Sequence, residues 1–284
     1  MDRVKKGYSF RAKAGFTLYA LCCLIMFIYL QFPYDMLKDR LEQMLSSAFR
    51  SEVTLGHMHS HLPLGIAADG MKINTSQVAD RIVFHPRLAR LFAAELGLDI
   101  SAELLSGGIE GFIQTPFKSM GDPFEMVLDV DKVDSAVFSR LLPANMRSSG
   151  IISGHAEFKG PSGSIEKAQG LISLQCTDGT IPLTIPRLPL DAIGFKTLDV
   201  DARIDKGMLT IEKAELSGDI SGTLQGAIRV RDQLDRSRLN LTGELILPEA
   251  MKNLAGAGNL DTSSGLKFSL KGTPGRPRFR MLSR

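Results

Sequence analysis

The spacing of hydrophobic and polar residues changes twice along the chain. Residues 14–34 form one apolar run without a charged side chain, and about 20 such residues suffice for a helix that crosses a bilayer. Residues 35–50 place apolar side chains at the spacing of one helix face. We expect this short amphipathic helix either to dock on the remainder of the protein or to lie on a lipid surface. From Val53 onward the period is two, which is typical of β-strands.

The clearest alternation runs from Leu216 to Val230, where one set of positions is apolar or glycine and the other set is polar. A sheet built from such segments has one apolar face and one solvated face. The residues predicted to form the apolar face are Leu216, Gly218, Ile220, Gly222, Leu224, Gly226, Ile228, Leu239, Leu241, Gly243 and Leu245. Their glycines have two interpretations. They permit coiling of the sheet or close approach of a covering layer, or they leave a groove for the apolar part of another molecule.

The predicted fold is mainly β, with an N-terminal transmembrane helix, the amphipathic helix, and then an antiparallel β-meander that includes a few short helices. Strands separated only by turn clusters such as Asp205–Gly207 favour a meander over βαβ units. The meander forms either a curved sheet or a sandwich. Short helices are expected after Pro86 and between Asp134 and Leu142. The segment from Pro182 to Pro189 holds three prolines, which favours a crossing or an edge.

These patterns set the predicted domain boundaries. Residues 1–13 form a basic tail, residues 14–34 the transmembrane helix, and residues 35–50 the amphipathic helix. Residues 51–147 form a mixed α/β part and residues 148–284 a β-rich part. The transmembrane side chains include Phe16, Leu21, Ile25, Phe27 and Leu30.

The net charge of +3 is concentrated at the N-terminus. The remainder of the chain is close to neutral, which disfavours nucleic acid as a partner. Because the basic flank precedes the apolar run, the positive-inside rule places residues 35–284 across the membrane. We expect a single-pass protein of the bacterial inner membrane, with a cytoplasmic N-terminus and a periplasmic C-terminal domain. A cleaved signal peptide is the alternative, but the run is long and no Ala-x-Ala-like site follows it.

Candidate chemistry is sparse. His57, His59 and His61 would share one strand face, yet no cysteine or carboxylate cluster accompanies them, so we interpret them as structural or solvated rather than as metal ligands. Cys176 is the one cysteine outside the apolar run, so it has no internal disulfide partner there. The sequence shows no Gly-x-Ser-x-Gly, P-loop or His-Glu-x-x-His motif. We predict no catalytic residue, no metal and no cofactor.

The C-terminus is basic, through Arg276, Arg278, Arg280 and Arg284. Such a segment is usually a solvated tail, and it would also suit an anionic lipid or an acidic partner.

The order of basic tail, single span, amphipathic helix and Leu-x-Gly-x-Ile strands resembles the periplasmic AsmA-like proteins. Within them, the chain is most similar to the type II secretion system protein N family, GspN. The segments that carry this resemblance are Ala79–Pro86, Leu105–Gly111 and Leu270–Pro277. It implies an AsmA-like sheet and either membership of an inner-membrane secretion assembly or kinship with proteins that handle lipid between membranes. It carries over no catalytic residues.

Two non-enzymatic functions follow as expectations. In the first, which we favour from the sequence, the protein is an accessory component of a type II secretion system. The sheet edges and helices of its periplasmic domain then dock other secretion subunits. In the alternative, the apolar face of the sheet binds phospholipid acyl chains. An enzymatic function is disfavoured because no nucleophile, base or metal constellation is present.

Overall fold

The computed structural model describes residues 10–49, 51–91, 93–116, 123–139, 148–161, 167–182, 192–231, 236–246 and 265–282. The helices are α1 (Phe10–Leu30), α2 (Tyr34–Phe49), α3 (Leu88–Leu91) and α4 (Ala136–Ser139). The strands are β1 (Val53–His61), β2 (Gly65–Ile73), β3 (Ser76–Pro86), β4 (Glu95–Leu104), β5 (Gly108–Pro116), β6 (Pro123–Asp134), β7 (Ser149–Pro161), β8 (Gln169–Pro182), β9 (Ala192–Asp205), β10 (Met208–Ser217), β11 (Ser221–Arg229), β12 (Arg238–Ile246), β13 (Leu266–Thr273) and β14 (Arg276–Met281).

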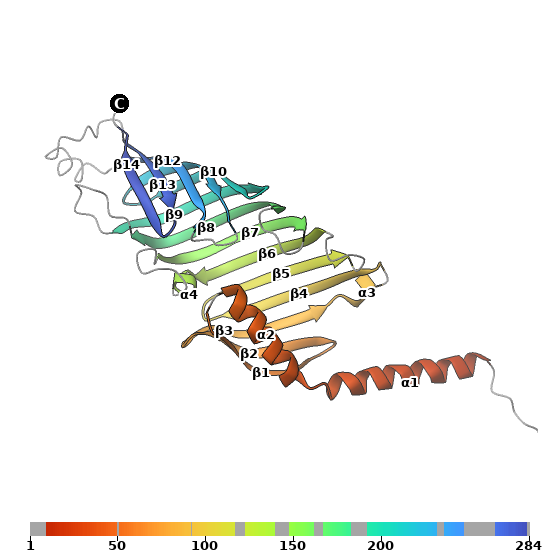
Figure 1. Ribbon diagram of the computed structural model, residues 1–284. Coiled ribbons are helices and arrows are strands. Elements are labelled where there is room, and N and C mark those ends of the chain that lie inside the picture. Colours follow the sequence, from red (N-terminus) through yellow and green to blue (C-terminus); the bar gives the residue numbers. More distant parts are fainter. Residues whose placement is uncertain are drawn as a thin grey trace, which may run out of the picture.

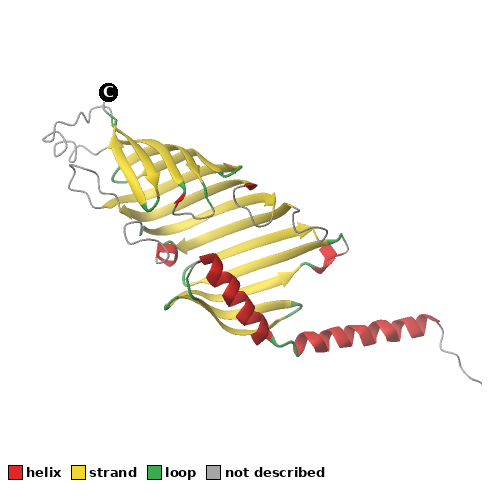
Figure 2. Ribbon diagram, in the orientation of Figure 1, coloured by secondary structure: helices red, strands yellow, loops and turns green. Residues whose placement is uncertain are grey.

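The 14 strands form one antiparallel sheet in which every strand pairs with the next along the chain (Figures 1 and 2). The prediction of a mainly β meander is confirmed. Of the two arrangements left open, the structure has the single curved sheet, long and twisted, which curls at the end formed by β10–β14 (Figure 1). Strands β1 and β14 are its two edges. The predicted boundary at residues 147 and 148 falls between β6 and β7, which pair directly.

Tight turns set the strand order. At the predicted turn Asp205–Gly207, Lys206 and Gly207 have positive φ values of 48° and 74°. Two successive residues with positive φ are typical of the hairpin turn whose twist matches that of the flanking strands. Because such connections are short, each strand pairs with the next strand in the sequence, and the result is a meander.

The alternating run from Leu216 to Val230 spans two strands, the end of β10 and all of β11. The chain bends at residues 218–220, so that Leu216 at the end of β10 pairs with Gly222 at the start of β11. Gly218 has a φ of 150° at this bend. The alternation continues through the bend because Ile220 inserts its side chain into the core, where it is almost fully buried.

Both predicted short helices are present in part. Helix α3 follows Pro86 and ends at Leu91, and Phe92, also expected there, lies outside the described residues. Helix α4 begins after Asp134, whose carboxylate accepts a hydrogen bond from the amide of Ala136 (2.8 Å), as helix-starting acids do. Residues 140–142 and 183–191, which include most of the predicted Pro182–Pro189 crossing, lie outside the described residues.

Helix α1 extends away from the sheet, whereas α2 lies across its first strands (Figure 1). By length and hydropathy, none of the described helices qualifies alone as a membrane span. Residues Gly15–Leu30 and Tyr34–Ser47 qualify only together, across a bend of 59°. The predicted single transmembrane helix over residues 14–34 is therefore not supported by this test. The last turn of α1 is tied to the sheet, because the Tyr29 hydroxyl donates a hydrogen bond to the His61 carbonyl oxygen (2.7 Å).

Candidate functional site

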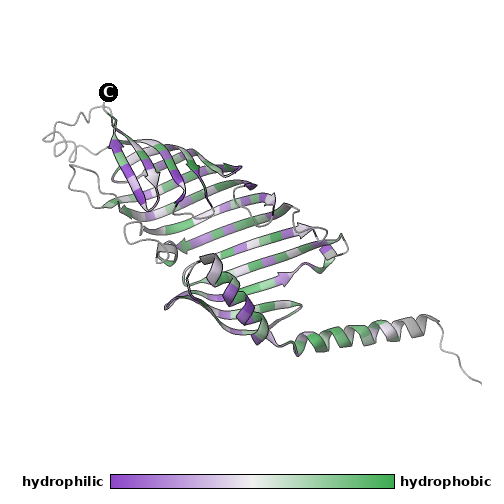
Figure 3. Cartoon of the chain, viewed as in Figure 1, coloured by the Kyte–Doolittle hydropathy of each residue, from purple (hydrophilic) through white to green (hydrophobic). Residues whose placement is uncertain are grey.

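One face of the sheet is apolar from the first strand to the last. Residues paired across neighbouring strands share a face, so the registers trace a single row of side chains over the whole sheet. That row reads Met58, Ala68, Ile82, Ala102, Ile109, Val130, Gly154, Leu174, Val200, Ala214, Leu224, Gly243, Phe268 and Met281. No member is polar. We call the face that contains this row the apolar face; the matching bands of hydropathy along the strands are visible in Figure 3.

The opposite face is polar. One of its rows, from β7 to β13, reads Ser153, Gln175, Asp199, Glu215, Thr223, Glu244 and Lys267. The alternation predicted from the sequence therefore holds over many strands, with one face solvated and the other needing a cover.

Helix α2 covers the N-terminal end of the apolar face. Its Leu37, Leu41 and Leu45 pack against the cluster that contains Leu55 and Met58. Of the two positions that the sequence left open for this helix, the structure has it docked on the sheet. Helix α4 joins a neighbouring cluster through Val137, which is buried.

Side chains of helix α2 also accept hydrogen bonds from backbone amides on the outer edge of β1. The Glu42 carboxylate accepts a hydrogen bond from the Leu55 amide (2.6 Å), and the Ser46 hydroxyl accepts one from the Val53 amide (2.9 Å). Free amides on an edge strand are otherwise available to a strand of another chain. This edge is therefore partly blocked by the protein itself.

The C-terminal end of the apolar face closes on itself. Phe268, Leu245 and Leu266 pack with Ile193 and Ile220, which belong to β9 and the β10–β11 bend. The rings of Phe268 and Phe279 stack, with centroids 5.1 Å apart. Curling of the last strands brings these side chains together, so this end of the face is a small core.

The residues predicted to form the apolar face, for which the sequence left a groove and a packing surface open, lie at this closed end. Ile220, Leu241 and Leu245 are buried, and Leu216 and Leu224 pack against the same core. Gly222, Gly226, Ile228, Leu239 and Gly243 complete the face on β11 and β12, and Gly218 lies in the bend.

Two of the predicted glycines lie where another side chain would collide. A Cβ atom on Gly226 would lie 2.4 Å from the Asn240 carbonyl oxygen, and the residue has a φ of 138°. A Cβ atom on Gly243 would lie 2.5 Å from Cζ of Phe268. At these two positions glycine permits the strong curl and the close aromatic contact, so it leaves no open space for a ligand.

The central section of the apolar face, on β5–β8, lies between the clusters at the two ends, and among the described residues of its strands only β6 contributes a buried hydrophobic residue, Val133. None of the buried hydrophobic side chains among the described residues belongs to β5, β7 or β8. Leu128, Ile172 and Leu174 are only partly buried, although they point to the same face as the two end clusters. Large and small residues alternate across this section. For example, Leu128 of β6 pairs with Gly111 of β5 and with Ala156 of β7. The sequence showed the alternation here, but it did not show that the middle would be less covered than the ends.

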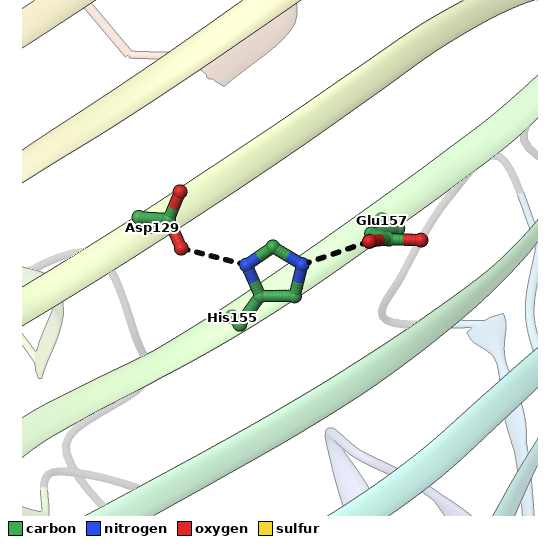
Figure 4. A network of polar contacts seen from close by, with 3 residues as sticks. All are labelled: Asp129, His155 and Glu157. Carbon is green, nitrogen blue, oxygen red and sulfur yellow. Dashed lines mark hydrogen bonds and ion pairs between the residues drawn. The ribbon is translucent and has the colours of Figure 1, made fainter.

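The polar face carries small charged networks. His155 contacts Asp129 through Nδ1 (2.6 Å) and Glu157 through Nε2 (3.1 Å), as Figure 4 shows. These contacts raise the pKa of His155 above its ordinary value of 6.5, with the bond to Asp129 as the largest cause and that to Glu157 next. All three side chains are exposed, so the network is solvated and lacks the enclosure of an active site.

A hollow of about 490 Å³ lies over the ends of β6–β9. Its polar-face lining includes Glu125 and Lys159, which form an ion pair, and Arg203, which pairs with Glu212 (3.0 Å). The lining also includes Glu157, which contacts His155 (3.1 Å), and Asp205, which accepts a hydrogen bond from Gln169 (3.0 Å), so these charged side chains already have partners.

The alternating histidines form two groups, because the rings of His57 and His59 lie 5.9 Å apart whereas His61 has other neighbours. His59 contacts Asp69 (3.4 Å), and His61 lies 3.2 Å from an Arg81 nitrogen, with its ring stacked edge-on to His85. Among the described residues, no group of three or more histidine, cysteine or acidic side chains could hold a metal ion. Burial raises the pKa of the Cys176 thiol, which favours its protonated form.

No protein-family model, curated protein or solved structure matches the chain. The resemblance to AsmA-like proteins and GspN therefore rests on the sequence motifs alone.

Proposed function

We propose that this protein is a non-enzymatic, membrane-anchored lipid-binding protein that holds acyl chains on the central section of its apolar face. The observation that carries this proposal is the unbroken apolar row, packed at both ends and only partly buried in between. Soluble monomers rarely leave an extended apolar patch uncovered, so such a section favours a bound apolar molecule.

The dimensions of the central section suit an acyl chain. Neighbouring strands lie about 4.8 Å apart, so the span from β5 to β8 is roughly 14 Å. An acyl chain in one leaflet spans about 15 Å, half of the hydrocarbon thickness. Each methylene group that leaves water contributes about 0.8 kcal/mol, so even partial coverage of one chain would be favourable.

Helix α1 is the proposed anchor. The apolar side chains of Phe16, Leu21, Ile25, Phe27 and Leu30 are all more than half exposed, and lipid would cover them. The charge pattern then orients the chain as a single-pass protein of the bacterial inner membrane, with its sheet in the periplasm. Because the Tyr29 hydroxyl bonds to His61, the last residue of β1, the first strand of the sheet would lie beside the membrane.

An accessory role in type II secretion is the second candidate, and it is favoured by the outer edge of β14, which pairs with no other described strand. Both edges nevertheless carry features that oppose strand pairing. Glu42 and Ser46 accept hydrogen bonds from β1, and β14 contains Pro277 between exposed arginines. A partner subunit would therefore have to dock elsewhere, for which the open apolar section is the main remaining surface.

A photo-crosslinking amino acid at Leu128 tests the proposal in living cells. Leu128 faces the central section, whereas its neighbour Val127 faces the polar side and serves as the matched control. We expect phospholipid adducts, detected by mass spectrometry, at position 128 and not at position 127. Adducts to another protein at position 128 would favour the secretion hypothesis instead. Adducts to neither, with the chain folded, would mean that the protein covers this section itself, and would overturn the proposal.

A further inference from the structure

The polar face carries paired cations and acids on its central strands but only cations on its last two strands. The polar side of β13 and β14 carries Lys267, Lys271, Arg276, Arg278 and Arg280, and no acidic residue occurs in either strand. The register places Lys271 opposite Arg278, with Arg276 and Arg280 on either side. We call these five residues the cationic edge. Arg229 and Arg238, paired on β11 and β12, extend it.

The cationic edge is not neutralised within the described part of the protein. All five side chains are exposed, and none forms an ion pair with another described residue. Glu244, opposite Lys267, is the nearest acid in the register. The central strands differ, because Lys159, Arg203 and Lys213 each pair with an acid there. Like charges in adjacent strands oppose strand pairing. A cluster of cations on two paired strands, unpaired among the described residues, therefore favours an external anionic partner that would neutralise them.

Exposed aliphatic side chains accompany these cations. Ile246 is 56% exposed, and Leu282 is 46% exposed. Leu282 is held beside Lys267 by a hydrogen bond from its amide to the Lys267 carbonyl oxygen (2.9 Å), so both side chains point to the polar side. Basic residues together with isolated aliphatic ones are typical of a surface that rests on a bilayer interface.

We propose that the cationic edge binds the headgroups of anionic phospholipids at a bilayer surface, with Ile246 and Leu282 entering the interface. Nucleic acid fits less well, because Phe268 and Phe279 lie on the apolar face and leave no exposed ring here on which a base could stack. A pairing strand of another protein is opposed by Pro277. The edge lies at the opposite end of the sheet from α1, some 60 Å along the strand order at about 4.8 Å per strand (Figure 1).

This inference does not rest on the proposed acyl-chain site, since it concerns the other face and the polar part of a lipid. The test uses the full chain in phosphatidylcholine nanodiscs, held on beads by an N-terminal tag. Fluorescent vesicles of phosphatidylcholine, with or without phosphatidylglycerol, are then offered to the beads. We expect binding that requires phosphatidylglycerol and that weakens steeply as salt is added.

The test variant is the triple change Arg276→Gln, Arg278→Gln and Arg280→Gln. The matched control is Lys159→Gln, Arg203→Gln and Lys213→Gln, which removes the same charge from the central polar face. Each basic residue near an anionic surface strengthens binding about fivefold, so the edge variant should bind on the order of 100-fold more weakly, and the control far less so. Leu282→Ser should weaken binding several-fold without changing its salt dependence.

Three results would overturn the inference. The first is vesicle binding that is indifferent to phosphatidylglycerol. The second is an equal loss of binding in the edge and control variants, each shown to be folded by circular dichroism. The third is displacement of the vesicles by poly-glutamate or by an oligonucleotide at matched charge concentration, which would assign the edge to an acidic protein or to nucleic acid.

Discussion

Leu224 of β11 lies directly opposite Gly243 of β12, on the apolar face and against the C-terminal core. A carboxylate in place of Leu224 would be held among apolar side chains without a partner. Leu224→Asp should therefore lower the free energy of unfolding by about 2–4 kcal/mol, measured by urea denaturation.

Gln225→Asp is the control for this change. Gln225 is exposed on the polar face opposite Thr242, so an added carboxylate stays solvated and should change stability by less than about 0.5 kcal/mol. Thr223→Asp is less suitable, because Thr223 lies between Glu215 and Glu244. Equal losses from the two Asp variants would show that the faces are assigned wrongly.

The second prediction concerns Gly243 itself. A methyl group there would lie 2.5 Å from the Phe268 ring and 2.6 Å from the Thr223 carbonyl oxygen. Gly243→Ala should cost about 1–3 kcal/mol of stability, because one of these neighbours must move. The measurement is thermal unfolding followed by circular dichroism.

Gly275, in the turn between β13 and β14, is the matched control. A Cβ atom there would meet nothing within 4 Å, so Gly275→Ala should be neutral or slightly stabilising. If Gly243→Ala behaved in the same way, the last strands would be less tightly curled than described.

The periodicity of the sequence predicted the meander and its two faces, because both depend on local alternation and short turns. The periodicity did not predict the features that depend on tertiary packing. Ile220 continues the alternation through a bend, so one alternating run spans two strands. For the apolar-face residues of β11 and β12, Leu241 among them, the sequence left a groove and a packing face open, and they belong to the packed end, whereas Leu128 and its neighbours are only partly buried. Which part of the face is covered depends on where α2 docks and where the sheet curls, and neither is a property of a single strand.

The third prediction concerns the edge of β1. Glu42→Ala would remove the acceptor of the Leu55 amide and should lower stability by about 1 kcal/mol or more. It should also raise the tendency to aggregate, measured by light scattering, because an edge amide becomes free. Glu42→Gln retains an acceptor oxygen and should preserve most of the stability. A loss of the same size in both variants would show that the charge of Glu42, and not its hydrogen bond, is what matters.

The fourth prediction concerns topology. If α1 anchors the chain as proposed, a reporter that is active only in the periplasm should be active when fused after Arg284. The purified protein should also begin at its original N-terminus, since the anchor is uncleaved. Loss of the first 30 or so residues in N-terminal sequencing would instead indicate a signal peptide, which is shorter than a full span. Activity of a cytoplasmic reporter alone would reverse the proposed orientation.

The fifth prediction uses the raised pKa of His155. The carboxylates of Asp129 and Glu157 favour the imidazolium form, so nuclear magnetic resonance should give a titration midpoint above 6.5 in the folded protein. Asp129→Asn should lower this midpoint more than Glu157→Gln does, because the bond to Asp129 is the larger cause. Glu110→Gln, which changes a neighbour of Asp129 that does not bond to the ring, should have the smallest effect.

The sign of the linked stability follows from the same shift. A histidine with a raised folded pKa contributes its full stabilisation below the unfolded pKa near 6.5, and that contribution is lost as the pH rises through the folded value. Because all three side chains are exposed, the contribution should be at most about 1 kcal/mol and should shrink in high salt. Unfolding measured from below pH 6 to above pH 8 should therefore show a slightly larger stability loss in the native protein than in Asp129→Asn. A loss of the same size in Asp129→Asn would mean that the network does not couple protonation to folding.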